Sequence, residues 1–147
     1  MKIFNDLKKV AKRPLVQDIV LLLTRLGLGG IFWVSGRTKV EEGSLLDIKP
    51  TTYGLFENLY GGVPLLPSDV SAVLATYAEH ALPLLLAVGL LSRFAAAGLF
   101  VMTLVIQLFV FPGAFLSPHL GWFALALVVM TQGPGRFSLD YLLGKKA

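Results

Sequence analysis

Four long apolar stretches, separated by short polar segments, constrain this chain more than any other feature. They cover residues 15–36, 70–91, 94–111 and 118–132, and the last is the shortest. A helix needs about 20 mostly apolar residues to cross the hydrocarbon of a bilayer, where every backbone polar group must be bonded internally. The sequence therefore predicts an all-α membrane protein built as a bundle of four transmembrane helices.

The composition supports this class and excludes several others. Hydrophobic residues make up 55% of the chain and charged residues only 15%, whereas a soluble domain carries about a quarter charged residues. The chain has no cysteine, which excludes disulfides, thiolate catalysis and cysteine-ligated clusters. We expect a single membrane domain over residues 1–147, with a short interfacial helix over about 138–143 that Ser138 caps.

The basic residues outside the spans lie unevenly on the two sides of the predicted bundle. One side has only Arg37, Lys39 and Lys49. The other side carries the larger set, which is Lys2, Lys8, Lys9, Lys12, Arg13, Arg93, Arg136, Lys145 and Lys146. Because basic residues in short loops stay in the cytoplasm, both termini are predicted to be cytoplasmic. The basic residues behind the net charge of +4 are therefore expected to contact a membrane surface, and no nucleic-acid partner is expected.

A long outer loop joins the first two predicted spans. It covers residues 37–69 and contains Tyr53, Phe56 and Tyr60, in a stretch that predicts a short amphipathic helix. Connections of this length are often functional lids. The loop is therefore interpreted either as a lid or as a plug over the mouth of the bundle.

Three ionisable residues lie near the middle of the predicted spans. Arg25 is at the centre of the first span, and Glu79 and His80 are at the centre of the second. A charge at this depth costs at least about 2.5–3.5 kcal/mol on insertion scales, so it needs a partner and often marks function. Because consecutive antiparallel helices place Arg25 and Glu79 at equal depth, we predict that they form an ion pair.

Other hydrogen-bonding side chains lie on the first three spans. The predicted intramembrane polar cluster consists of Arg25, Glu79, His80, Thr24, Thr76, Thr103 and Gln107. It is interpreted either as a latch that fixes packing or as a proton or quinone site, because a buried carboxylate changes protonation with its surroundings. In the second interpretation the cofactor-binding residues are Arg25, Glu79 and His80. The sequence identifies no catalytic residue.

The sequence contains no recognised motif for binding a metal or a nucleotide. His80 and His119 lie on different spans, and no HExxH pattern or comparable cluster is present, so no metal site is expected. The sequence also lacks a phosphate-binding glycine loop, a nucleophile elbow and a dinucleotide-binding fingerprint.

Three segments carry a more specific pattern. They are residues 25–32 continuing to Lys39, residues 77–79 with the turn at 89–93, and residues 133–140. Together they resemble the DoxX family of small bacterial four-helix membrane proteins, within the wider DoxD-like group. The resemblance implies a multi-pass protein of the bacterial cytoplasmic (inner) membrane. It also implies an association with redox systems, since some relatives are subunits of an archaeal thiosulfate:quinone oxidoreductase.

Three functions are compatible with these observations. The first is an inner-membrane subunit or accessory protein of a redox system, non-catalytic rather than an enzyme itself. Its candidate cofactor is a quinone, and its candidate partner is a soluble or membrane oxidoreductase. The second function is a small-solute or proton-coupled transporter with Glu79 as the protonatable site. The third is a structural or assembly factor that docks a soluble partner, and the oligomeric state stays open.

Overall fold

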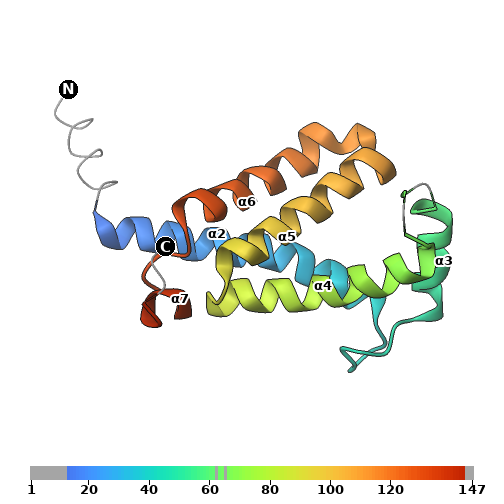
Figure 1. Ribbon diagram of the computed structural model, residues 1–147, viewed down its shortest axis with the longest axis horizontal. Helices are drawn as coiled ribbons and strands as arrows, with labels where there is room; N and C mark the ends of the chain where they lie inside the picture. The colour runs from blue at the N-terminus through green and yellow to red at the C-terminus, as the bar shows by residue number, and fades with distance from the viewer. Residues whose placement is uncertain (1–12, 62, 65, 145–147) are drawn as a thin grey trace.

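The structure is a computed structural model that describes residues 13–61, 63–64 and 66–144 (Figure 1). Within those residues the regular structure is helical, apart from one isolated β-bridge. The helices long and apolar enough to cross a membrane are Pro14–Lys39, Ser68–Val88, Ser92–Val110 and Pro112–Gln132. The prediction of an all-helical chain with four such helices is confirmed. The basic residues that lie outside the described residues are Lys2, Lys8, Lys9, Lys12, Lys145 and Lys146.

The helices α2 (Pro14–Lys39) and α4 (Ser68–Val88) pack against each other along most of the length of α4 (Figure 1). They approach closely at Gly36, where an added Cβ would lie 3.0 Å from His80 Cε1 and 3.1 Å from Glu79 Cβ. Gly29 packs against Pro83 in the same manner, at 3.4 Å from its carbonyl oxygen. Because glycine has no side chain, these positions let the two backbones approach closely.

The helices α5 (Ser92–Val105) and α6 (Leu120–Gln132) form the second pair of the bundle (Figure 1). The core between the pairs consists of Leu28, Phe32, Leu86, Ala95, Ala96, Leu99, Ala126 and Val129. The connection from α5 to α6 is helical for most of its length, through Ile106–Val110, Pro112–Ala114 and Phe115–His119. The fourth helical run therefore begins at Pro112, earlier than the predicted start at 118.

The segment between α2 and α4 contains regular structure. Val40 and Ile48 form an antiparallel bridge, and the Arg37 guanidinium donates to the Ser44 carbonyl. The helix α3 (Pro50–Leu59) follows, with Phe56 buried, so the predicted short helix is confirmed. Figure 1 shows α3 beside the start of α4, at the end of the bundle that we call the loop end.

The tail folds back on the opposite end of the bundle. The helix α6 ends at Gln132 because Gly133 has a φ of 80° and Pro134 cannot continue a helix. The chain then reaches α7 (Leu139–Leu142), whose first turn is capped by the Ser138 hydroxyl accepting from Tyr141 N–H. Figure 1 shows α7 near the turn between α4 and α5, at what we call the tail end.

Candidate functional site

Glu79 lies buried at the loop-end half of the bundle, where it is paired with Lys39. Lys39 Nζ lies 2.6 Å from Glu79 Oε2, and both side chains are more than nine-tenths buried. Lys39 Nζ also donates to Ser35 Oγ at 2.9 Å and to the Ser35 carbonyl at 3.2 Å. Because Ser35 and Lys39 are one helical turn apart on α2, both face the same region of α4.

The predicted Arg25–Glu79 ion pair is wrong. The close approach of Gly36 to Glu79 fixes the register of the two helices, and this register places Arg25 beside Gly89 instead. Since each helical residue advances 1.5 Å, Glu79 and Gly89 are separated by about 15 Å along α4. The prediction aligned the centres of the two spans, but α2 starts at Pro14 and extends beyond the end of α4.

His80 is buried next to Glu79 but contacts a different set of groups. Its Nδ1 lies 2.7 Å from the Thr76 carbonyl, and its ring packs edge-on against Trp33 with centroids 5.3 Å apart. Because a carbonyl oxygen only accepts, Nδ1 is the donor in this contact. Nε2 is buried without a hydrogen-bond partner among the described residues. His80 thus fills the α2–α4 contact beside Gly36.

The three threonines of the predicted polar cluster do not gather at Glu79. Thr24, Thr76 and Thr103 each donate their hydroxyl to the carbonyl one turn earlier in the same helix. Their hydrogen bonds are therefore local to each helix.

Gln107 forms its hydrogen bonds at the connection between α5 and α6. Its Nε2 donates to the Pro112 carbonyl, and its Oε1 accepts from His119 Nδ1 at 2.6 Å. His119 packs on Trp122 with ring centroids 5.0 Å apart. Within the described part of the chain, no group of three or more His, Asp or Glu side chains could hold a metal ion.

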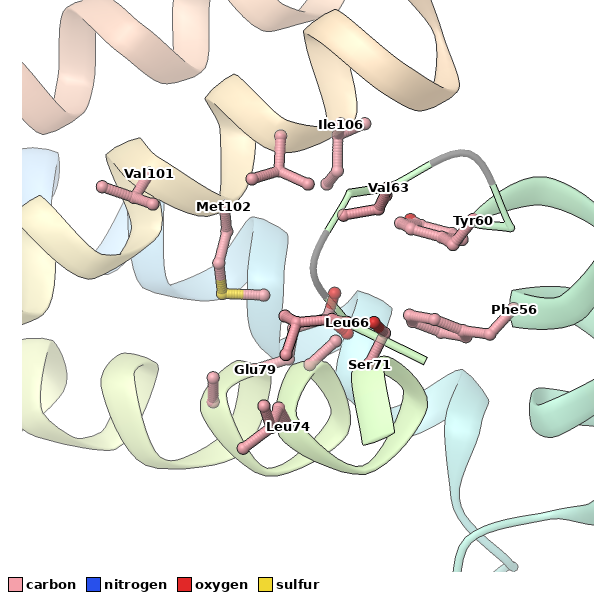
Figure 2. Close-up of a pocket in the computed structure, with 13 residues that line it drawn as sticks. Phe56, Tyr60, Val63, Leu66, Ser71, Leu74, Glu79, Val101, Met102 and Ile106 are labelled. Carbon is pink, nitrogen blue, oxygen red and sulfur yellow. The ribbon is translucent and has the colours of Figure 1, made fainter. Parts of the chain in front are cut away.

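A cavity of about 210 Å³ lies beside Glu79, between α4, α5 and the segment that follows α3 (Figure 2). Most of its wall is apolar, and Figure 2 shows Met102 and Val63 on opposite sides of it. Leu74 and Val101 line it and are 54% and 56% exposed, so the cavity opens on the lateral surface of the bundle. This surface would face lipid in a membrane.

Two hydroxyl groups line the cavity together with the Glu79 carboxylate. Ser71 Oγ is buried and has no hydrogen-bond partner among the described residues. Tyr60 stacks on Phe56 with ring centroids 4.2 Å apart. Burial, and secondarily the nearby Glu79 carboxylate, raises the pKa of Tyr60 to about 12. Its hydroxyl therefore keeps its proton at neutral pH and is available as a donor.

Arg25 is completely buried at the tail end, where it contacts backbone. Its Nη2 donates to the Phe137 carbonyl at 2.5 Å. Its Nη1 lies so close to Gly89 that an added Cβ would be 2.0 Å away, and Asp140 is the acidic group that acts on it electrostatically. Arg25 therefore joins α2 both to the tail and to the end of α4.

Asp140 connects α7 to the turn between α4 and α5. Its carboxylate accepts from the backbone N–H groups of Leu91 and Ser92, each at 2.9 Å. Its own N–H donates to the Gly89 carbonyl, also at 2.9 Å. The first N–H groups of a helix have no partner inside that helix, so Asp140 caps α5 from a distant part of the sequence.

Asp18 and Arg136 form a second ion pair at the tail end. Arg136 Nε lies 2.5 Å from Asp18 Oδ2, and the Arg136 backbone N–H donates to Asp18 Oδ1 at 2.8 Å. Asp18 is buried, whereas the Arg136 side chain is 48% exposed. The pair attaches the tail to the first half of α2.

Four residues at the site were missed by the sequence prediction. They are Lys39, Ser35, Tyr60 and Ser71. The spacing of Ser35 and Lys39 on either side of Gly36 was an available signal, because it places two polar groups on the glycine face of α2. Tyr60 and Ser71 carried no such signal, since only the packing of α3 against α4 brings them together.

Comparison with known protein families gives a match for the larger part of the chain. A family model described as DoxX matches residues 20–112. This range includes Arg25, Lys39, Glu79 and all the residues that line the cavity, but it excludes the tail over 133–140. No curated protein and no solved structure matches the chain. The loop-end site thus lies wholly within the matched region.

Proposed function

The chain belongs to the DoxX family, and from that premise we propose that it is a membrane subunit of a redox system that binds a quinone ring beside Glu79. The observation that carries the proposal is the apolar cavity next to the buried Lys39–Glu79 pair. Ligand sites are typically apolar pockets with a few polar groups that orient the ligand.

The residues present fit the headgroup of a quinone. Sites for drug-sized ligands have volumes of about 300–1,000 Å³, so a cavity of about 210 Å³ suits a single small ring system. The unpartnered Ser71 hydroxyl and the protonated Tyr60 hydroxyl are donors for carbonyl oxygens. The lateral opening at Leu74 and Val101 leaves room for an apolar tail to extend into lipid.

The charged residues of the site have separate tasks in this proposal. A bound quinone would supply the chemistry of taking up electrons together with protons. Glu79 holds or releases a proton at the wall of the cavity, and Lys39 stabilises its carboxylate form through the 2.6 Å contact. When Glu79 is protonated, the Lys39 ammonium keeps its two hydrogen bonds to Ser35. The buried Lys39 ammonium therefore stays hydrogen-bonded after Glu79 has lost its charge.

The location and partner are part of the same proposal. The excess of basic residues on the side of the termini supports cytoplasmic ends, and the pairing of Lys39 with Glu79 removes one free basic group from the opposite side. Together with the family resemblance, this orientation supports the inner membrane of a bacterium and membership of the DoxD-like group. The proposed partner is a soluble or membrane oxidoreductase that exchanges electrons with the quinone.

A cavity-filling substitution tests the proposal. Ala78 lines the cavity on α4, whereas Ala81 on the same helix is exposed and does not line it. We expect protein purified in mild detergent to retain quinone in the wild type and in Ala81→Phe, but not in Ala78→Phe. The lipophilic extract is measured by mass spectrometry, with thermal unfolding as the check on folding. Wild-type protein without quinone, or equal retention in the two folded variants, would refute the proposal.

A further inference from the structure

A second cavity, of about 250 Å³, lies in a groove between α2 and α4 and shares no residue with the first. Its walls include Leu26, Gly30 and Trp33 from α2, and Pro83 and Leu84 from α4. Leu26 and Leu84 are 45% and 49% exposed, so this groove also opens on the lateral surface of the bundle. A groove with these walls accommodates a flexible apolar chain.

Arg25 lines one end of the groove and has hydrogen-bonding capacity left over. It is fully buried, and only Nη2 has a hydrogen-bond partner, the Phe137 carbonyl. Nε and Nη1 have none among the described residues. Asp140 acts on this cation electrostatically, but buried N–H donors without an acceptor remain costly. The groove therefore combines apolar walls with a buried cation at one end.

The depth of Arg25 indicates where such an anion comes from. Arg25 contacts Gly89 and the tail, so it is level with the end of α4 and the start of α5 at Ser92. Because the spans of α4 and α5 both end at this turn, we take this level as the start of the lipid headgroups for these two helices. Trp33 lies about 12 Å further along α2, at 1.5 Å per residue, which is deeper in the hydrocarbon.

We infer that the groove binds one anionic phospholipid, with its phosphate at Arg25 and one acyl chain extending along Gly30 towards Trp33. The other charged groups at this end are Arg93, Asp140 and the Asp18–Arg136 pair. Arg93 is exposed and adds positive charge, and basic residues near the surface attract anionic lipids. The headgroup depth of Arg25 favours a phospholipid over a free fatty acid.

Two glycines of α2 provide a matched test of this site. An added Cβ at Gly30 or at Gly27 would meet nothing within 4 Å, so at both positions a side chain starts without a clash. Gly30 lines the groove and Gly27 does not. We would compare the wild type, Gly30→Leu and Gly27→Leu by native mass spectrometry in detergent. The probes are phosphatidylglycerol and phosphatidylcholine of equal chain length, and oleate.

The inference predicts a specific order of adducts. Phosphatidylglycerol adducts on the wild type and Gly27→Leu exceed those of phosphatidylcholine about fivefold, the effect of about one basic residue near the headgroup. Gly30→Leu lowers the phosphatidylglycerol adducts about tenfold, which corresponds to excluding about two methylenes from the groove.

Four results would overturn the inference. They are equal adducts for the two phospholipids, equal adducts for the two leucine variants, a preference for oleate, and a dimer that Gly30→Leu dissociates. The last result would identify the groove as an interface between two copies of the chain. Because the quinone cavity is not altered in these variants, the outcome is independent of the proposed function.

Discussion

The two ends of the bundle both contain buried charges, but they bond them differently. At the tail end Arg25, Asp140 and Asp18 all bond to backbone groups of distant segments, at Phe137, at Leu91 and Ser92, and at Arg136. Asp18 also pairs with the exposed Arg136 side chain, so one bond at this end joins two side chains. At the loop end Glu79 bonds to a side chain, Lys39, and faces a cavity.

This difference separates structural charges from functional ones. A charge that satisfies backbone groups holds parts of the chain in place, and its removal leaves those groups without partners. A charge that bonds to another side chain beside a cavity can change protonation or partner while the backbone stays in place. We therefore assign the backbone-bonded charges of the tail end to stability and the Lys39–Glu79 pair of the loop end to quinone binding.

The largest effect is expected from Asp140→Ala. This substitution leaves the N–H groups of Leu91 and Ser92 unbonded and removes the acidic group that acts on buried Arg25. Removing one partner of a buried charge interaction costs about 3–5 kcal/mol, so the free energy of unfolding should fall by about that amount. Thermal unfolding in detergent measures it. Asp69→Ala is the control, since Asp69 is an exposed acid in the first turn of α4 and should cost less than about 1 kcal/mol.

The next effect tests the loop-end pair. Glu79→Gln should lower stability by about 1–3 kcal/mol, because Lys39 loses its charged partner but keeps its hydrogen bonds to Ser35. The double variant Lys39→Met/Glu79→Leu should regain this stability, since apolar residues often replace a buried ion pair without loss. It should nevertheless bind no quinone. A double variant that still binds quinone would show that the pair takes no part in binding.

A smaller effect is expected where α2 and α4 approach closely. Gly36→Ala places a Cβ 3.0–3.1 Å from His80 and Glu79, so the helices must separate slightly. Overpacking of this kind costs about 1–3 kcal/mol, and we expect the lower half of that range for one methyl group. Gly30→Ala is the matched control in the same helix, because nothing lies within 4 Å of its Cβ. Equal stability of the two variants would mean that Gly36 does not fix the helix register.

The last prediction concerns Tyr60, whose effect is absent at neutral pH and appears only at alkaline pH. Its pKa is raised from 10.0 to about 12 in the folded chain, so the neutral hydroxyl is favoured by folding. The stabilisation is complete below pH 10 and is lost as the pH rises from 10 to about 12, where the unfolded chain ionises first. Tyr60→Phe should remove this part of the pH dependence, as measured by unfolding at pH 9 to 12 (roughly the interval that brackets the shift). An unchanged slope would contradict the burial of the hydroxyl.

The sequence predicts the number and type of helices but not their register. Apolar length alone identifies four spanning helices, because each must satisfy its own backbone in lipid. The register of α2 on α4 depends on Gly36 and Gly29 meeting Glu79 and Pro83, and an apolar helix offers many other alignments. The prediction that Arg25 pairs with Glu79 was wrong for this reason.

The candidate site is predicted in part for a similar reason. Glu79 stands out as an acid in an apolar span, whereas Lys39 near the end of α2 looks like a surface charge until the packing buries it. The contacts of the tail with Asp18 and Arg25 join residues far apart in the sequence, so no local pattern reveals them.

The most direct test of the difference between the two ends is ligand-dependent stabilisation. A short-tailed, water-dispersible quinone is added to the wild type, Glu79→Gln and Asp18→Asn, and the shift in unfolding temperature is measured for each. We predict that all three fold, that quinone raises the unfolding temperature of the wild type and Asp18→Asn equally, and that Glu79→Gln does not respond. Equal stabilisation of Glu79→Gln, or loss of the response in Asp18→Asn, would contradict the assignment of quinone binding to the loop end.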